Sequence, residues 1–341
     1  MTRVLITGAM GFIASHAIAD LLAHGYDVRG TVRSRPKALL EAALARLPGA
    51  ERLELVEADL LREGSFDKAA QGCDAVFHMA SPYAVNVKDP QRELVDPAVK
   101  GTLNVLQAAV KAGSVKRVVL TSSFAAITDE PPADHYLTES DWNGKSSLKR
   151  NPYYFSKTEA EKAAWRFMDS VKPAFDLIVI NPFLVIGPSY TRALNESNKM
   201  LADMTKGVYP GVLALAWGFV DVRDVARAHV LALETPGATG RYLCAGEILS
   251  MRQTVNVLRK ALPNAKLPWL PLNYSFATTL VKLISFTQPS GVGSYLRSHL
   301  GRRLRYDSGK IRRELGMTFR PAAESITEAV ADMVAKGHIK V

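Results

Sequence analysis

Cysteine is nearly absent from this sequence, which has Cys73 and Cys244 as its only thiols among 341 residues. Two thiols are too few for a disulfide framework, so a reducing compartment is expected. A signal-peptide or transit-peptide pattern is also lacking, because an apolar strand-like run begins at once. The most apolar late stretch, residues 275–286, contains Lys282 and is too short to span a bilayer. These absences predict a cytoplasmic protein without a membrane partner.

Acidic residues are in the minority: 33 Asp and Glu stand against 43 Lys and Arg, so the formal net charge is +10. No recognised nucleic-acid motif accompanies this excess, and nucleic acid is not expected as a partner. One real basic cluster lies late in the chain and consists of Arg297, Arg302, Arg303, Arg305, Lys310, Arg312 and Arg313. It is either the solvated face of late helices or a rim that attracts an anionic cofactor or substrate.

Apolar residues, in contrast, make up 48% of the chain, which is ample for a core. In the first half, apolar strand-like runs alternate with helical patterns. We expect strands at residues 4–7, 27–33, 53–57, 75–79, 117–121 and 177–181, and helices at residues 12–24, 36–47, 93–112 and 158–169. Strands that are apolar on both faces and alternate with helices indicate a parallel sheet covered by helices. The expected fold class is therefore α/β, with a Rossmann-type doubly wound parallel sheet.

The length suggests about two domains. Residues 1–185 are expected to form the cofactor-binding domain. Residues 186–341 are expected to form mainly a smaller mixed substrate lobe, with a segment at about 218–245 that returns to the first domain.

A glycine-rich turn joins the first expected strand to the first expected helix. Its residues are Gly8, Ala9, Gly11, Phe12 and Ile13, and Ala14 follows. Small residues at positions 8, 11 and 14 permit a tight turn and a close approach of the backbone to a pyrophosphate. The phosphates would lie at the helix N-terminus, where free N–H groups favour anions. The pattern predicts dinucleotide binding.

The end of the second strand indicates which dinucleotide is bound. An NAD site usually has an acid there for the ribose 2′-hydroxyl, whereas this chain has Arg33, followed by Lys37. Both side chains would hold a 2′-phosphate through charge-assisted hydrogen bonds. The predicted cofactor is NADP(H).

Further strand ends are expected to line the same cofactor. These positions are Asp59 and Leu60 after the third strand, Met79, Ala80 and Ser81 after the fourth, and Thr121 at the end of the fifth. The carboxylate of Asp59 would accept a hydrogen bond from the adenine amino group. His78 is more often a packed strand histidine than an acid or base. No metal site is expected.

The catalytic candidates are Tyr153 and Lys157, which stand four apart at the start of a helical stretch and so share one helix face. A nearby ammonium lowers the pKa of a phenol and makes it a better proton donor. Ser123 follows the fifth strand, thirty residues earlier, where it would polarise a carbonyl. A second Tyr-x-x-x-Lys, formed by Tyr306 and Lys310, lies far from the expected cofactor site.

These motifs together resemble the extended short-chain dehydrogenase/reductase family. The matched pieces run from Thr7-Gly-Ala-Met-Gly-Phe-Ile13 through Asp59-Leu60, Val76–Ser81, Gly101-Thr-Leu-Asn104, Leu120–Ser123 and Tyr153-x-x-x-Lys157 to Asn181-Pro182. Within the family, Thr31-Val-Arg33 and Pro82-Tyr83 are similar to the dihydroflavonol 4-reductase and aldehyde/ketone reductase branch. Phe12-Ile-Ala14 favours methylglyoxal/isovaleraldehyde-type reductases. The Asn-Trp-Tyr-Cys-Tyr motif of cinnamoyl-CoA reductases is absent, which disfavours CoA thioesters.

The resemblance implies a role for each candidate. Tyr153 would donate the proton, Lys157 would lower its pKa and hold the nicotinamide ribose, and Ser123 would polarise the carbonyl. The nicotinamide face would be set by Pro182 and by neighbours such as Val185. Substrate-lining candidates are Tyr83, Ile127, Tyr190 and Trp217.

The favoured function is NADPH-dependent reduction of an aldehyde or ketone to the alcohol. Apolar residues of the second lobe predict a substrate with an apolar or aromatic body; they are Leu213, Leu215, Trp217, Phe276, Leu280 and Phe286. The enzyme alternatives are a sugar-nucleotide epimerase or dehydratase and a 3β-hydroxysteroid dehydrogenase-like enzyme, and the non-enzyme alternative is an NADP-sensing regulator. The chain is expected to be a monomer or a homodimer.

Overall fold

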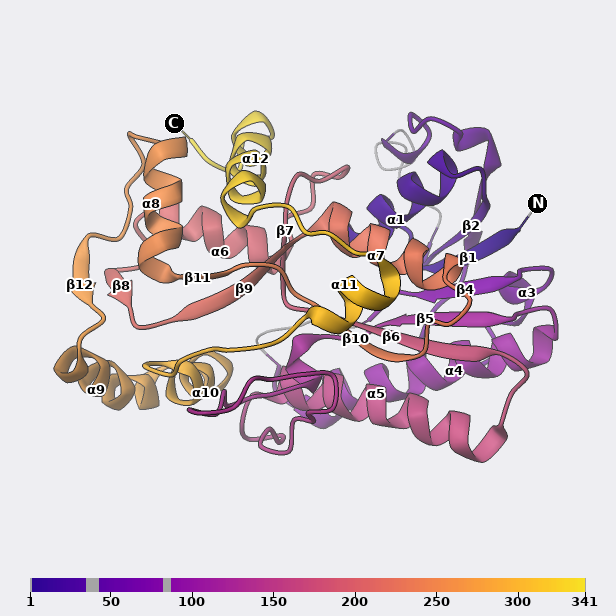
Figure 1. Cartoon of the computed structure of the whole chain (residues 1–341), viewed down its shortest axis with the longest axis horizontal. Coiled ribbons are helices and arrows are strands. Elements are labelled where there is room, and N and C mark those ends of the chain that lie inside the picture. Colours follow the sequence, from indigo (N-terminus) through magenta and orange to yellow (C-terminus); the bar gives the residue numbers. More distant parts are fainter. Residues whose placement is uncertain (1, 35–42, 82–86, 341) are drawn as a thin grey trace.

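The computed structural model describes residues 2–34, 43–81 and 87–340, and its centre is a seven-stranded parallel sheet (Figure 1). The strand order is β10-β6-β5-β4-β1-β2-β3. The strands are β1 (Arg3–Thr7), β2 (Asp27–Val32), β3 (Leu53–Glu57), β4 (Ala75–His78), β5 (Arg117–Thr121), β6 (Asp176–Pro182) and β10 (Gly240–Cys244). The order reverses between β1 and β4, the kind of switch point at which such sheets bind ligands. The predicted fold class is confirmed.

Helices cover both faces of this sheet (Figure 1). One face carries α1 (Phe12–Ala23) and α7 (Val222–Glu234), and the other carries α4 (Asp96–Ala112) and α5 (Pro152–Val171). The strand β1 shows why: Val4 and Ile6 pack towards the first pair of helices, whereas Leu5 packs towards the second. Successive side chains of a strand point to opposite faces, so a strand buried on both sides must be apolar throughout.

Smaller elements complete this part of the chain. They are η1 (Ala50–Arg52), α3 (Asp67–Ala70), η2 (Gln91–Val95), η3 (Phe124–Ala126) and α11 (Gly309–Leu315). The helix expected at residues 93–112 is split into η2, a π-helical turn, and α4. Pro97 lies in the first turn of α4, directly after this π-helical turn, and has no backbone N–H to donate to the turn before it.

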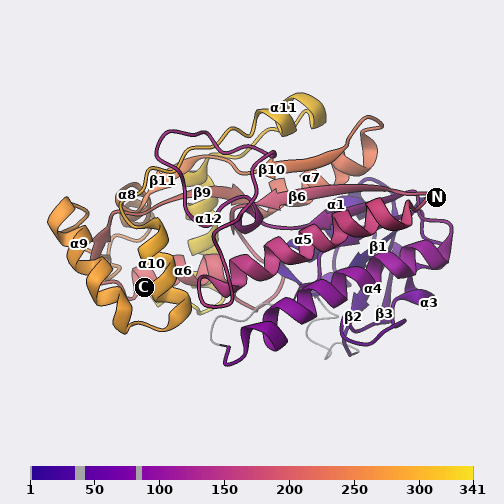
Figure 2. The same cartoon turned by 90° about the horizontal axis from the view of Figure 1, so that it is seen from below.

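The second lobe has its own sheet and core, and it lies at one end of the central sheet (Figures 1 and 2). A three-stranded sheet orders β11 (Ile248–Ser250), β9 (Ala216–Asp221) and β7 (Leu184–Ile186), and β8 (Gly211–Leu213) pairs with β12 (Leu270–Leu272). Its helices are α6 (Glu196–Thr205), α8 (Met251–Ala261), α9 (Ser275–Ile284), η4 (Ser285–Thr287), α10 (Ser290–His299) and α12 (Ala322–Ala335). The domain limits given above stay a prediction.

Most of the helix expected at residues 36–47, together with Lys37 and Tyr83, lies outside the described residues. Among the helices of the described ranges, none is both long and apolar enough to cross a membrane.

Candidate active site

The structure brings Ser123, Tyr153 and Lys157 together at the carboxyl end of β5. Ser123 follows β5 and caps η3, where its hydroxyl accepts a 3.2 Å hydrogen bond from Ala125 N–H. Tyr153 and Lys157 come from the first turns of α5, and the Tyr153 phenol is hydrogen-bonded to Ser123. Lys157 Nζ lies 5.8 Å from the centre of the Tyr153 ring and donates a 2.9 Å hydrogen bond to Ser81 Oγ. One cluster therefore joins residues that follow β4, β5 and the start of α5.

Burial dominates the ionisation of both catalytic candidates. It raises the pKa of Tyr153 to about 12, against the opposing effect of the hydrogen bond with Ser123. It lowers the pKa of Lys157 to about 8. The lowering of the phenol pKa by Lys157 stays a prediction, because burial and the hydrogen bond with Ser123 are the causes that act on Tyr153 here. Near neutral pH the phenol is protonated and the amine is charged.

The second Tyr-x-x-x-Lys pair is not an alternative centre. Tyr306 precedes α11 and donates a 2.7 Å hydrogen bond from its hydroxyl to Gly246 O. Lys310 donates to the carbonyl groups of Thr239 and Arg241, each at 2.9 Å. Both side chains hold backbone segments together.

A buried carboxylate fixes the strand ends beneath this cluster. Glu161, two turns after Tyr153 on α5, accepts hydrogen bonds from Ser122 Oγ at 2.5 Å and Asn181 Nδ2 at 2.8 Å. Arg241 of β10 completes its coordination through a 2.6 Å bond from Nε. Asn181 also donates to the carbonyl of Ser123 at 3.2 Å. Sequence reasoning assigned no role to Glu161 or Arg241, although Glu161 continues the four-residue spacing of Tyr153 and Lys157.

The start of α5 is held by the second lobe. Asn151 caps α5 in the left-handed conformation (φ 47°), which only a few residue types adopt readily. Its amide accepts a 2.6 Å hydrogen bond from Ser294 Oγ and donates to Asp129 and, at 3.0 Å, to Ser298 Oγ. Ser294 and Ser298 belong to α10, so this helix is tied to the residue two positions before Tyr153. No pattern in the sequence indicates a contact this distant along the chain.

The glycine turn has the geometry that a pyrophosphate requires. Gly8 has φ +71°, and a Cβ at this position would lie 3.0 Å from Ala80 Cβ. Thr7 Oγ1 accepts hydrogen bonds from the N–H groups of Met79 and Ala80, at 3.0 and 2.9 Å, which clamps the end of β4 against the turn. The N-cap of α1 is Gly11, and no side chain caps its free N–H groups. These residues fit an anionic dinucleotide at the N-terminus of α1.

The other cofactor candidates that the structure describes lie in or shortly after strands of the two lobes, with different local roles. Arg33 directly follows β2, and its side chain is exposed. Asp59 Oδ1 accepts from Leu61 N–H at 2.9 Å, while the Leu60 side chain packs on Gly101. Pro182 ends β6, and Val185 is buried in β7.

Two buried histidines near this edge are structural. His78 Nδ1 lies 2.9 Å from Thr7 Oγ1, and burial lowers the pKa of His78 to about 3. His229 donates from Nδ1 to Val225 O and accepts from Thr121 Oγ1 at 2.7 Å, and burial lowers its pKa to about 4. The Thr121 hydroxyl is therefore already engaged, and both rings are neutral.

A cavity of about 410 Å³ opens beside Ser123 and Tyr153 and extends into the second lobe. Its lining is mostly apolar and aromatic and includes Tyr154, Phe183, Met200, Tyr209, Leu213, Leu215, Trp217, Val292, Tyr295 and Leu296. Trp217 donates a 2.9 Å hydrogen bond from Nε1 to Tyr295 Oη, which orients both rings. Of the four substrate candidates, the structure places only Trp217 in this lining, and it adds Tyr154, Tyr209 and Tyr295, which the sequence did not indicate.

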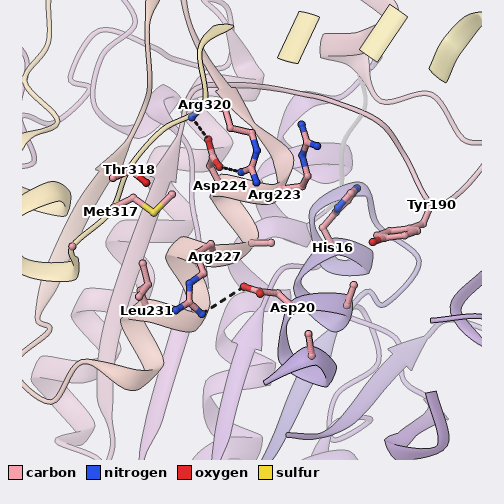
Figure 3. A pocket seen from close by; sticks show the side chains of 14 residues that line it. His16, Asp20, Tyr190, Arg223, Asp224, Arg227, Leu231, Met317, Thr318 and Arg320 are labelled. Atoms are coloured by element: carbon pink, nitrogen blue, oxygen red, sulfur yellow. Dashed lines mark hydrogen bonds and ion pairs between the residues drawn. The ribbon is translucent and has the colours of Figure 1, made fainter. Parts of the chain in front are cut away.

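Two of those candidates lie elsewhere, and Tyr83 is outside the described residues. Ile127 is buried in a separate apolar cluster with Phe124 and Leu137. Tyr190 packs against His16, with ring centres 4.5 Å apart, beside a second cavity of about 550 Å³ between α1 and α7 (Figure 3).

Ion pairs join residues that line this second cavity (Figure 3). Asp224 pairs with Arg320, and Asp20 lies 4.0 Å from Arg227. These pairs tie the segment before α12 to α7, and α7 to α1.

Replacement of Gly8 by alanine tests the fit of the glycine turn. The added Cβ would meet Ala80, and its positive φ adds about 1–2 kcal/mol of strain, so both stability and NADPH affinity should fall. Gly25→Ala is the matched control, because Gly25 has φ +84° and no neighbour within 4 Å of an added Cβ. Thermal unfolding and NADPH titration measure the two effects. Equal NADPH affinity in both variants would show that the turn does not contact the cofactor.

Comparison with known proteins agrees with this architecture. Residues 4–245 match the family model described as the NAD dependent epimerase/dehydratase family. The chain is 43% identical over 276 residues to cinnamoyl-CoA reductase CAD2 of Medicago truncatula, covering 78% of this chain and 82% of that protein. It is 37% identical to tetraketide alpha-pyrone reductase 1 of Arabidopsis thaliana, covering 99% and 97%.

Solved structures give the same result. The yeast methylglyoxal/isovaleraldehyde reductase Gre2, complexed with NADPH, superposes with a TM-score of 0.81 at 29% identity, covering 99% of this chain and 100% of that one. The motifs, the fold and the cluster at the end of β5 have a common explanation. The chain belongs to the NAD dependent epimerase/dehydratase family, the extended short-chain dehydrogenases/reductases.

Proposed function

We propose that this protein reduces an aldehyde or ketone with an apolar or aromatic body to the corresponding alcohol, using NADPH. The chain is an NADP-dependent oxidoreductase of carbonyl groups, as its named reductase relatives and the NADPH-bound structures of its neighbours indicate. The observation that carries the finer proposal is the position of the Ser123–Tyr153 pair in the wall of an apolar cavity.

The proposed chemistry divides between cofactor and chain. NADPH, when bound, supplies the hydride. A carbonyl oxygen within reach of both hydroxyls would be polarised by Ser123 and protonated by Tyr153 as negative charge develops on it. The raised pKa of Tyr153 keeps its proton in place until the oxygen becomes more basic.

Lys157 and the glycine turn are proposed to bind the cofactor. The Lys157 ammonium faces Ser81 at the end of β4, on the path from the glycine turn to Tyr153. We propose that it hydrogen-bonds the nicotinamide ribose, with Pro182 and Val185 against the nicotinamide. Arg33, and Lys37 beyond it, would hold the 2′-phosphate, and Asp59 the adenine.

The substrate class is inferred from the cavity. A volume of about 410 Å³ suits a ligand of moderate size, and five aromatic side chains (Tyr154, Phe183, Tyr209, Trp217 and Tyr295) offer flat apolar contacts. A 3β-hydroxysteroid-type substrate fits the same apolar lining. A sugar nucleotide fits less well, since sugars need many polar partners and the exposed Arg33 stands where NAD-retaining epimerases carry an acid.

An aryl acyl-CoA thioester is the second candidate, since the relatives include proteins named cinnamoyl-CoA reductase. Against it, Pro152, Tyr154 and Phe155 replace the Trp, Cys and second Tyr of the motif expected for those enzymes. An assay that compares NADPH-dependent turnover of cinnamoyl-CoA with that of cinnamaldehyde and aromatic ketones decides between the two candidates.

We also propose the cytosol as the compartment and a monomer or homodimer as the assembly. Cys73 and Cys244 are both buried free thiols, which supports a reducing environment.

The variant Tyr153→Phe tests the proton donor. Turnover should fall roughly 10²- to 10⁴-fold while NADPH affinity is retained, because the phenyl ring keeps its packing and loses only the acid. Tyr306→Phe is the matched control, as it removes a hydroxyl from the other Tyr-x-x-x-Lys pair and should retain most of the activity. NADPH oxidation at 340 nm measures both. Unimpaired turnover in Tyr153→Phe would assign the proton to another group.

Arg33→Ser tests cofactor selection. Loss of a charge-assisted contact with the 2′-phosphate should raise the KM for NADPH by roughly tenfold or more and leave that for NADH unchanged. Arg46→Ser, at another exposed arginine before β3, is the control. An equal rise for both cofactors in Arg33→Ser contradicts a 2′-phosphate contact.

The pH dependence of NADPH binding tests Lys157. Its pKa is about 8, so below this pH the ammonium attracts the anionic cofactor, and affinity should fall as pH rises above about 8. His78 (pKa about 3) and Tyr153 (pKa about 12) face the same space and do not titrate in this range. In Lys157→Arg, which stays charged, the fall should disappear. An identical fall in both proteins would assign it to another group.

A further inference from the structure

Large apolar side chains gather on the surface of the second lobe without covering a cavity. Trp269, Phe276 and Phe286 are 79%, 74% and 71% exposed, and Tyr274, Leu280, Leu283 and Ile284 are also exposed. Phe276, Leu280 and Phe286 are among the residues from which an apolar substrate body is predicted, and the structure corrects this use, because none of them lines the cavity beside Tyr153. Contiguous exposed apolar surface of this kind marks an interaction site.

The apolar residues of α9 form one stripe. Phe276, Leu280, Leu283 and Ile284 follow the i, i+4, i+7, i+8 spacing of a single helix face. Ala277 is buried, and Val281 packs partly into the core of the lobe, so α9 is anchored by an adjacent face and the stripe points outward. Together with Tyr274 before α9 and Phe286 after it, these residues are called the α9 surface below.

The chain segments that carry and flank the α9 surface hold charge of one sign. Residues 248–306 contain no Asp or Glu and hold nine of the basic residues, a number close to the whole net charge of +10. They are Arg252, Arg259, Lys260, Lys266, Lys282, Arg297, Arg302, Arg303 and Arg305.

Three of these basic residues are at or beside the α9 surface. Lys282 lies in α9 itself. Arg297 stacks over the Phe286 ring at 4.5 Å, and Arg252 donates a 3.1 Å hydrogen bond to Asn273, next to Tyr274.

A second copy of the chain is a poor occupant for this surface. A two-fold dimer would place the same patch against itself, so acid-free basic segments would face each other and repel. The occupant should carry negative charge together with an apolar interior.

We propose that the α9 surface docks the protein onto an anionic phospholipid bilayer. α9 would lie in the plane of the interface, with its apolar stripe at the acyl boundary and Arg252, Lys282 and Arg297 at the headgroups. The shortness of α9 excludes a spanning helix but not one that lies on the membrane. Aromatic residues such as Trp269 and Tyr274 suit this interface.

Docking would also place the cavity close to the membrane. α9 leads through η4 into α10, whose Val292 is exposed and also lines the cavity. Figures 1 and 2 both show α9 at the outer end of the second lobe, next to α10 and away from the central sheet. An apolar substrate dissolved in the bilayer would thus be near the cavity mouth.

Vesicle co-sedimentation tests the proposal without depending on the reaction. The purified protein should pellet with phosphatidylcholine vesicles that contain about 30 mol% phosphatidylserine, and bind pure phosphatidylcholine at least roughly tenfold more weakly. Salt raised from about 0.1 M to about 0.5 M should weaken the binding, because it screens the headgroup attraction.

Variants locate the surface. Phe276→Asp and Leu283→Asp should each weaken binding to the anionic vesicles by roughly tenfold or more, and Lys282→Glu should weaken it less. The matched controls replace exposed side chains of other helices: Val110→Asp in α4 and Lys68→Glu in α3. Both variants should bind the vesicles as the wild type does. Unchanged melting temperature and unchanged turnover of a water-soluble aldehyde would show that the α9 variants remain folded.

Three outcomes would overturn the proposal. The first is that the wild type fails to bind anionic vesicles. The second is that Phe276→Asp binds these vesicles as tightly as Val110→Asp does. The third is that polyglutamate, which lacks an apolar interior, binds to the protein as tightly as the vesicles do. That result would assign the α9 surface to an acidic protein partner. Sedimentation velocity tests a second copy of the chain as the occupant. If the wild type is a dimer that Phe276→Asp dissociates, and it binds no vesicles, the α9 surface is a contact between copies.

Discussion

The site depends on one buried ion pair, between Glu161 of α5 and Arg241 of β10. Their side chains are 0% and 7% exposed, so each charge needs the other. The carboxylate also accepts hydrogen bonds from Ser122 and Asn181, at the ends of β5 and β6, and a longer one of 3.4 Å from Trp165 Nε1. Arg241 also reaches the carbonyls of Glu139 and Asp141, in the segment that precedes α5. The pair thus joins α5 to three neighbouring strands, close to the hydrogen bond between Ser123 and Tyr153.

The second constraint joins the two lobes at the start of α5. Asn151 takes a strained left-handed conformation that Asp129, Ser294 and Ser298 hold in place. α10 carries both serines and also lines the cavity beside Tyr153. The side chain of Asn151 therefore couples the position of this cavity wall to the position of Tyr153. The network therefore ties the position of Tyr153 to the folded second lobe.

The parts that could be predicted from the sequence are those that local patterns encode. The strand–helix alternation, the turn at Gly8 and the four-residue step from Tyr153 to Lys157 each depend on neighbours close in the chain, and the parallel sheet then brings Ser123 to Tyr153. The parts that could not be predicted depend on long-range packing. Tyr190 packs on His16 and does not line the cavity beside Tyr153, burial raises the pKa of the Tyr153 phenol, and the apolar face of α9 points outward. Composition alone does not show whether an apolar side chain points into the core, into a cavity or into solvent.

The most direct test of the central claim is hydride transfer itself. NADPH that carries deuterium at both C4 positions of the nicotinamide would be incubated with the enzyme and aromatic ketones, aromatic aldehydes and cinnamoyl-CoA, and the products analysed by mass spectrometry. The account predicts an alcohol from a ketone or aldehyde with one deuterium on the carbinol carbon. Unlabelled products, or none from any carbonyl compound of the panel, would contradict carbonyl reduction by NADPH at the Ser123–Tyr153 centre.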